Sequence, residues 1–256
     1  MTAEGTVIDS IQIKCITADG KTVYDLRLGN VQIESIASSS GGGESIGFKY
    51  EQIDLTTTPV NADGSLGEPR NFQWDKSKNA PGNSVAEPTA ADDDVGAGGE
   101  GKYYMFVDGV DGGSDSEHAP NSFEIEGFSL NLVKLFSGNV QGNAEFGDLS
   151  VDMILNSAMP QLAALAANGT KISAIQFKCI SDDGETLYDV RLCNVIISNL
   201  ADSSTGSDQL SLNYEKIDIR STPKLANGMF DATKTFQWDV KNNTAGGEIA
   251  APTAAN

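Results

Sequence analysis

Apolar and polar residues alternate along much of this chain with a period of two, which is the pattern of β-strands that bury one face. The stretch 122–135 shows the alternation most clearly, from Phe123 to Leu132. Loops rich in Gly, Asp and Ser separate such stretches. The pattern predicts a mostly β protein, a barrel or a sandwich, with strands over residues 103–107, 122–135, 146–155, 171–180, 186–200, 209–222 and 235–240.

The alternation changes phase inside the stretch 209–222. Tyr214 belongs to the first phase, whereas Ile217 and Ile219 follow the other. A β-bulge or a change of the buried face at Lys216 explains such a slip, because one extra residue moves every later side chain to the opposite face.

One segment, residues 157–168, has a helical pattern instead. Ser157 is suited to cap the helix, and Pro160 is tolerated in its first turn. Gly169 follows at the position where a left-handed backbone commonly ends a helix. The segment 136–145 contains glycines and reads as a loop between strands.

The chain contains one block twice. Residues 5–90 align with residues 169–254 at a shift of 164 without a gap, and roughly 40 of the aligned residues are identical. The tetrapeptide Phe-Gln-Trp-Asp at 72–75 returns unchanged at 236–239. The segment between the copies, residues 102–168, has no counterpart earlier in the chain. A full unit is therefore that segment followed by the duplicated block.

The repeat defines the domain organisation that we expect. Residues 101–244 form one complete barrel, and residues 1–80 form the C-terminal half of a first barrel. Residues 81–100, rich in Ala, Gly, Pro and Asp, predict a flexible linker, and residues 245–256 begin a second linker. An orphan half-barrel would expose unpaired strand edges. The sequence is therefore either part of a tandem array or a chain whose first domain is truncated. The alternative is that a neighbouring chain supplies the missing half.

The chain of 256 residues is strongly acidic. It has 36 Asp and Glu against 17 Lys and Arg, a formal net charge of −19 and a sequence pI near 4.2. Nucleic acids and anionic membranes bind basic patches, so neither is an expected partner. No apolar run reaches the length of a membrane span, and residues 1–8 lack the pattern of a secretory signal peptide. We interpret this acidity as a property of the protein surface that prevents nonspecific association.

The three cysteines do not form a disulfide framework, because their number is odd and no Cys-x-x-Cys spacing occurs. Cys15 and Cys179 occupy the same position of the repeat, and Cys193 replaces Gly29. These positions lie inside predicted strands, so we expect buried free thiols.

The sequence contains no catalytic constellation. The single histidine, His118, lies in a loop without partners at a catalytic or metal-binding spacing. Residues 108–115 resemble a calcium loop, but Gly112 stands where an oxygen ligand is needed and no Glu closes the loop. A turn between strands is the better interpretation. We therefore expect neither an enzyme nor a cofactor nor a metal site.

Aromatic residues at matching positions of the repeat are the predicted core anchors. Phe236 and Trp238 alternate on one face of a short strand, with Gln237 and Asp239 on the other. This arrangement favours packing in the core over a ligand-binding aromatic box. The predicted anchors are Tyr50, Phe72, Trp74, Tyr214, Phe236 and Trp238.

Several segments of the complete unit resemble the haemolysin-coregulated protein (Hcp) family. Residues 104–112 are similar to its opening strand and loop, residues 123–132 to its second strand, and residues 157–162 to its small helix. The segments 212–217 and 236–239 are the most family-specific. The resemblance covers the whole unit, and residues 1–80 match its back part.

The resemblance implies an Hcp-like antiparallel β-barrel with one short α-helix per unit, here tandemly repeated. It further implies hexameric rings that stack into the hollow inner tube of a type VI secretion system. Besides the chain itself, the implied partners are a spike protein, a contractile sheath and effector cargo. Such proteins lie in the bacterial cytoplasm before firing, are then secreted without a cleaved signal peptide, and have no catalytic residues.

Members of this family use an extended hairpin loop for ring stacking at the place where this chain has residues 136–145. By this resemblance, the candidate stacking residues are Phe136, Ser137, Gly138, Asn139, Val140, Gln141, Gly142 and Asn143.

The tandem arrangement leaves other functions open. Tandem Hcp-like barrels could build an extracellular filament or surface array, held by strand complementation between chains. Stacked rings enclose a wide lumen, whereas a single-start fibre has none, so symmetry separates the two functions. An effector enzyme linked to an Hcp unit would need a catalytic domain, which these residues do not contain.

Overall fold

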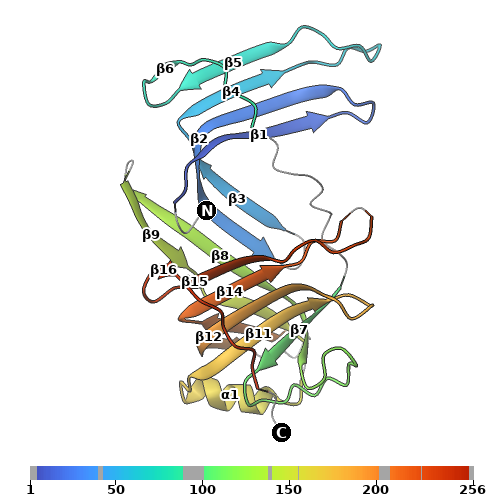
Figure 1. Ribbon diagram of the computed structural model, residues 1–256, viewed down its shortest axis with the longest axis vertical. Helices are drawn as coiled ribbons and strands as arrows, with labels where there is room; N and C mark the ends of the chain where they lie inside the picture. Colours follow the sequence, from blue (N-terminus) through green and yellow to red (C-terminus); the bar gives the residue numbers. More distant parts are fainter. Residues whose placement is uncertain are drawn as a thin grey trace. The chain divides into compact units, whose positions relative to one another are not determined.

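The computed structural model describes residues 5–39, 43–88, 101–137, 140–154, 156–201, 208–225 and 227–253. These residues form antiparallel strands and one short helix, as the sequence predicts (Figure 1). The chain divides into two compact units. The first unit comprises Met1–Ile36, Ile46–Asp93 and Val133–Gly142, and the second comprises Ala37–Ser45, Asp94–Leu132 and Asn143–Asn256.

The strands and the helix follow the repeat. The first copy contains β1 (Ile8–Ile16), β2 (Thr22–Ser39), β3 (Glu44–Lys49), β4 (Gln52–Thr57), β5 (Arg70–Asp75) and β6 (Ala80–Pro81). The segment between the copies contains β7 (Lys102–Val107), β8 (Phe123–Ser137), β9 (Val140–Phe146), β10 (Leu149–Met153) and α1 (Met159–Ala167). The second copy contains β11 (Ile172–Ile180), β12 (Thr186–Ala201), β13 (Asp208–Asn213), β14 (Lys216–Ser221), β15 (Lys234–Asp239) and β16 (Thr244–Ala245).

Six strands of the second unit form a closed ring of hydrogen-bonded neighbours. β7 pairs with β11 and β8, β8 pairs with β10, β10 pairs with β13, and β12 pairs with both β13 and β11. A sheet closed in this way leaves no free edge around the ring and buries its inner face. β14, β15 and β16 extend the sheet outward from β12. The predicted antiparallel barrel is confirmed.

The long strand β12 has two neighbours along one edge. Its residues 188–193 pair with β14, and its residues 196–201 pair with β13. The chain passes from β13 to β14 through Tyr214 and Glu215. The phase change at Lys216 therefore marks the start of a new strand, not a bulge within one strand.

The barrel core is built from both parts of the unit. The ring of Phe128 lies 5.9 Å from Tyr103, 5.1 Å from Phe177 and 6.1 Å from Tyr188, measured between centroids. Tyr103 and Phe128 come from the segment between the copies, whereas Phe177 and Tyr188 come from the second copy. Each part therefore supplies the apolar surface that the other needs to bury.

The helix α1 packs against β12. Pro160 lies in its first turn, and Gly169 has a φ of 59°, both as predicted. Ser157 does not cap the helix, because the N-cap position is Ala158. The Oδ1 atom of Asn156 instead accepts a 2.8 Å hydrogen bond from the Ala158 N–H.

The first copy has the same strand register as the second. Ile8 pairs with Val31 across β1 and β2, as Ile172 pairs with Val195 across β11 and β12 at a shift of 164 residues. The pairs β2–β4, β4–β5 and β5–β6 reproduce β12–β14, β14–β15 and β15–β16 in the same way. The repeat in sequence is thus a repeat in backbone pairing.

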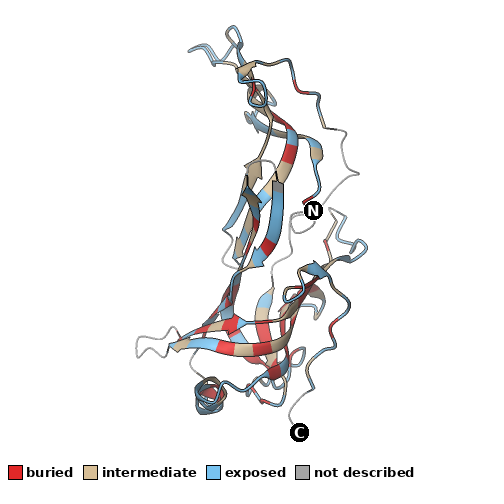
Figure 2. Cartoon of the chain, turned by 90° about the vertical axis from the view of Figure 1, so that its left-hand side faces the viewer, coloured by how far each residue is buried: buried red, intermediate tan, exposed pale blue. Residues whose placement is uncertain are grey.

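The first copy lacks the strands that close the barrel of the second. Within the described residues, β1 and β3 each pair with β2 and with no other strand. Their counterparts β11 and β13 pair in addition with β7 and β10. In Figure 2, buried residues gather on the strands of the second unit, whereas the first-copy strands are mostly exposed or intermediate.

Two expectations fail in the first copy, which has no counterpart of the segment 102–168. Phe72, a predicted core anchor, is 53% exposed, and Cys15 is an exposed thiol instead of a buried one. Cys179, at the position that corresponds to Cys15, is buried, and Cys193 is half-buried. Of the other anchors, Tyr214 and Trp238 are each 5% exposed, whereas Tyr50, Trp74 and Phe236 are half-buried.

Candidate assembly surfaces

The candidate stacking residues lie at the tip of a hairpin formed by β8 and β9. We expected a loop over residues 136–145, but β8 extends to Ser137 and β9 begins at Val140. A Cβ atom on Gly142 would lie 3.2 Å from the Cβ of Leu135. The glycine therefore marks a close approach between paired strands, not a loop. The positions 138 and 139 lie outside the described residues.

The hairpin tip, Val133–Gly142, belongs to the first compact unit. The Lys49 Nζ lies 4.3 Å from the ring centroid of Phe136, which is a cation–π distance. The Gln141 Nε2 donates a 2.7 Å hydrogen bond to the carbonyl of Gly5. Two of the candidate stacking residues thus contact residues of a back-half block.

The residues that follow the last short strand of each copy lie on the sheet as a strap, which we define as residues 82–88 and 246–253. The side chain of Ile249 is 6% exposed, and Val85, at the same repeat position, is 5% exposed. We expected both stretches to belong to flexible linkers. One buried apolar residue in each strap anchors it instead.

An Asp and an Arg hold the backbone of each strap. The Arg191 Nη1 donates a 2.9 Å hydrogen bond to the carbonyl of Ile249, and the Ile249 N–H donates one of 3.4 Å to Asp218. Arg27 and Asp54 make the same contacts with the first strap, at 3.4 and 3.1 Å. No motif or spacing in the sequence indicates this clamp.

Buried charges continue across the sheet beneath the second strap. Asp189 is 7% exposed and pairs with Arg191 at 2.9 Å, and Asp218 is fully buried and pairs with Arg220 at 2.7 Å. Arg220 also contacts Glu248 of the strap at 3.0 Å. Because an unpaired buried charge is strongly destabilising, these pairs and the strap depend on one another.

Competing effects set the pKa of Asp218. Burial raises it, but hydrogen bonds from Arg220, from the Ile249 N–H and from Gln237 outweigh burial and hold the pKa below its usual range. The hydrogen bond to Asp218, followed by the one to Glu248, raises the pKa of Arg220. The pair is therefore ionised at neutral pH.

Glu215 ties together three elements at the passage between β13 and β14. Its carboxylate accepts hydrogen bonds of 2.8 Å from Lys171 and of 2.8 Å from Asn194, and one of 3.4 Å from Lys241. The hydrogen bond from Lys171 is the largest cause that lowers the pKa of Glu215 to about 2. This residue has a structural role in the barrel wall.

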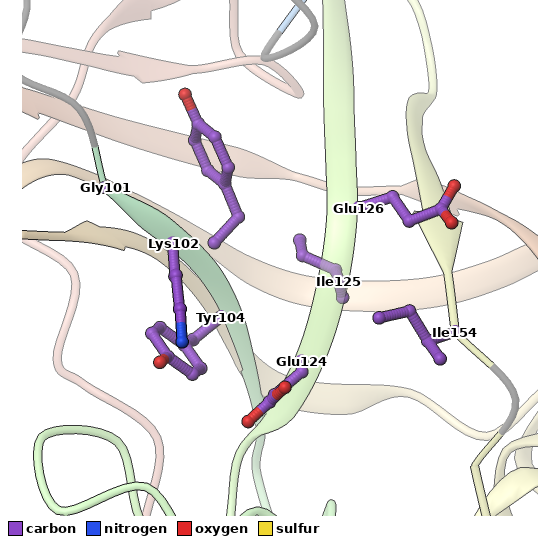
Figure 3. Close-up of a pocket in the computed structure, with 8 residues that line it drawn as sticks. Gly101, Lys102, Tyr104, Glu124, Ile125, Glu126 and Ile154 are labelled. Atoms are coloured by element: carbon purple, nitrogen blue, oxygen red, sulfur yellow. The ribbon is translucent and has the colours of Figure 1, made fainter.

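A pocket of about 370 Å³ opens between β7 and β8 (Figure 3). Its lining comprises Gly101, Lys102, Tyr103, Tyr104, Glu124, Ile125, Glu126 and Ile154. Figure 3 shows that the charged side chains come from both strands. No Ser, Cys or His is among these lining residues.

In the loop that resembles a calcium site, two carboxylates accept hydrogen bonds from backbone N–H groups. Asp108 accepts a 2.9 Å hydrogen bond from the Thr253 N–H of the strap, and Asp111 accepts one of 2.8 Å from the Gly113 N–H. His118 is exposed. In the described part of the chain, no group of three or more His, Cys, Asp or Glu could hold a metal ion.

No described helix has the length and apolar character needed to span a bilayer.

The strand pairing of the second unit defines the class of the protein: a small antiparallel β-barrel with one short helix. Residues 104–220 match the family model described as type VI secretion system effector, Hcp. The resemblance to the Hcp family seen in the sequence is therefore confirmed over these residues.

A solved structure shares the fold of part of this chain, and others are similar to it. A structure described as that of a type six secretion system protein is 18% identical with a TM-score of 0.50, and the match covers 56% of this chain and 98% of that one. Hcp1 from Salmonella typhimurium is 17% identical with a TM-score of 0.47, over 56% and 97%. A type VI secretion system effector from Yersinia pestis is 17% identical with a TM-score of 0.43, over 54% and 99%. No curated protein matches this chain.

Proposed function

We propose that this chain is a self-assembling structural component of a type VI secretion tube, in which its barrels form rings and the rings stack. The observation that carries the proposal is the closed barrel of Hcp type, built by residues that match the family model over 104–220. Cyclic closure of identical barrel contacts gives a ring without open fibres in the ring plane.

The hairpin tip supports the stacking part of the proposal. Phe136 and Gln141 contact Lys49 and Gly5 of a back-half block within the first unit. A tip that fits a back-half block of one unit has the chemistry to bind the equivalent surface of a neighbouring ring. We therefore assign residues 136–143 to ring stacking, with the spike protein, the sheath and effector cargo as further partners.

Secretion tests this function directly. The tagged chain is produced in a bacterium with an active type VI system and in the same strain without the contractile sheath. The expected result is that the chain appears in the medium of the first strain and stays in the cells of the second, since it leaves without a cleaved signal peptide. Equal amounts in both media, with a cytoplasmic marker absent from both, would contradict the proposal.

One observation favours a second function. The open edges of β1 and β3 are strand templates of the kind that hold complemented filaments together. An extracellular filament or surface array of tandem barrels is therefore the alternative, and it differs from a secretion tube in having no lumen.

A further inference from the structure

We propose that the clamp beneath each strap, Arg191 with Asp218 and Arg27 with Asp54, is a peptide-binding site that the chain fills with its own strap. The ligand is an extended segment with one β-branched aliphatic residue whose backbone N–H and C=O groups are both free to form hydrogen bonds. When the strap is displaced, the site binds such a segment from a separate molecule. The proposal does not depend on secretion or on ring stacking.

One residue of each strap is recognised at three points. The carbonyl of Ile249 accepts a 2.9 Å hydrogen bond from the Arg191 Nη1, and its N–H donates one of 3.4 Å to Asp218. Its side chain is 6% exposed. The clamp therefore satisfies both backbone polar groups of one extended residue, as a neighbouring strand does, and the sheet buries the side chain beside them.

The two straps show that the clamp holds a class of sequences. Gly-Asn-Ser-Val-Ala-Glu-Pro at 82–88 and Gly-Gly-Glu-Ile-Ala-Ala-Pro at 246–252 differ at four of their seven positions. Val85 is nevertheless 5% exposed and makes the same two backbone contacts, at 3.4 Å with Arg27 and 3.1 Å with Asp54. A site that holds two different segments in one way recognises what they share, a β-branched aliphatic residue followed by Ala.

Neighbouring amides hold the clamp side chains from within the sheet. The Gln237 Nε2 donates a 3.2 Å hydrogen bond to Asp218, and the Gln176 Nε2 donates one of 2.8 Å to Asp189, which pairs with Arg191 at 2.9 Å. The same partners recur in the first copy, 164 residues earlier. A site whose donor and acceptor are already held in place loses little conformational freedom when a peptide binds.

Charge adds a preference that belongs to the second site. Glu248, directly before the anchoring Ile249, contacts Arg220 at 3.0 Å. The first copy has Thr56 at the position of Arg220 and Ser84 at the position of Glu248. The second site therefore favours a segment with an acidic residue just before the aliphatic one, by the modest amount that an exposed ion pair contributes.

The second strap can leave its site while the sheet stays intact. A Cβ atom on Gly246 would lie 2.9 Å from the backbone of β15, so this residue is held in place, whereas a Cβ atom on Gly247 would meet nothing within 4 Å. Apart from Ile249, the strap contacts the barrel through Glu248 and the backbone of Thr253. A segment with one buried apolar side chain opens at a low free-energy cost, and Gly247 is its hinge.

Fluorescence anisotropy with a labelled peptide tests the site. The probe is a peptide of residues 244–253 with an N-terminal fluorescein, titrated with the full chain that carries Ile249→Glu. The variant releases its own strap, because a carboxylate is too costly to bury at that position. We expect saturable binding to this variant and at least about tenfold weaker binding to the unchanged chain, whose own strap competes at a high effective concentration.

A peptide N-methylated at Ile249 is the matched control. It keeps the side chain but lacks the N–H that Asp218 accepts, so it should bind at least about tenfold more weakly. A Glu248→Gln peptide should bind only slightly more weakly than the unmodified one. Equal affinities of the N-methylated and unmodified peptides would overturn the proposal, as would equal binding to the variant and the unchanged chain.

Two measurements on the variant make a negative result decisive. Its circular dichroism spectrum should match that of the unchanged chain, and hydrogen exchange of residues 246–253 should be fast. Absence of peptide binding to a folded chain with a released strap would overturn the proposal. If Ile249→Glu unfolds the barrel, Ile249→Ala replaces it, and this chain should bind the peptide more tightly than the unchanged chain does. Equal binding to those two chains would likewise overturn the proposal.

Discussion

Trp74 and Trp238 occupy the same position of the repeat in different surroundings. Trp238 is 5% exposed and stacks on Phe236 and Phe146, with centroid distances of 6.3 and 6.5 Å. Trp74 is half-buried in the open first copy. Substituting each tryptophan in turn therefore shows how much of its contribution to stability depends on its surroundings.

Trp238→Ala should lower the free energy of unfolding by about 3–5 kcal/mol, because it leaves a cavity where a buried side chain packs on two aromatic rings. Trp74→Ala is the matched control and should cost less, since water already reaches part of its surface. Denaturant unfolding followed by circular dichroism measures both changes. An equal loss for the two variants would contradict the difference in burial.

Acid should weaken the protein through Asp218. Its folded-state pKa lies below the value of about 3.9 that is usual for an unfolded chain, so the ionised carboxylate stabilises the fold above that pH. The contribution is lost as the pH falls through the folded-state pKa. Asp218→Asn should therefore lower stability at pH 7 by about 3 kcal/mol and flatten the loss of stability below about pH 4.

The control for this change is Asp231→Asn, since Asp231 is 43% exposed and contacts Lys234 at 3.8 Å. An exposed pair of this kind contributes about 1 kcal/mol or less. Unfolding free energies measured in urea between pH 2 and pH 7 test both variants. An unchanged pH dependence in Asp218→Asn would contradict the role assigned to the buried carboxylate.

Cysteine burial shows what sequence cannot predict at the residue scale. Cys15 and Cys179 have nearly the same neighbours along the chain, but Cys15 is exposed and Cys179 is buried. The difference comes from β7, which pairs with only one of the two strands among the described residues. A local pattern shows which face is apolar, and a partner distant in sequence decides whether that face is covered.

At the scale of elements, Ile249→Ala tests the strap. Removing the one buried apolar side chain of the second strap should cost about 2 kcal/mol. Hydrogen exchange of residues 246–253 should become fast, while β14 and β15 stay protected. Glu248→Ala removes only an exposed ion pair of the strap, with Arg220, and should therefore speed exchange less than Ile249→Ala does. Slow exchange in Ile249→Ala would mean that other contacts hold the strap.

The hairpin is the second element to test. The double variant Phe136→Ser and Gln141→Ala removes the contacts of the tip with Lys49 and Gly5 and should reduce stacking of the particles without unfolding the barrel. Met229→Ser, at a 62% exposed position on a different loop, is the control. Sedimentation velocity measures the loss of large particles. Particles of unchanged size would contradict the stacking role of residues 136–143.

Most strands follow from alternation because each has one buried face. The strand predicted over 171–180 is observed as β11, and the one over 103–107 as β7. The hairpin strand β9 was missed because glycine, which marks a close approach there, also marks loops. The strap was missed because a single buried residue produces no periodic pattern of apolar residues. The match of residues 88–90 with 252–254 does indicate that the tail belongs to the repeated unit.

At the scale of the whole molecule, the repeat explains why one chain holds a closed barrel and an open half. The closing strands β7, β8 and β10 lie in a segment that occurs once in this sequence, whereas the back block occurs twice. Counting the repeated parts of the sequence therefore predicts the open edges.

The tube function is the central claim, and negative-stain electron microscopy of the purified chain tests it most directly. Class averages should show rings or short hollow tubes with six-fold or pseudo-six-fold symmetry, since Hcp-type barrels arranged in a ring enclose a lumen. Thin fibres without a lumen would contradict the claim and would favour the strand-complemented filament.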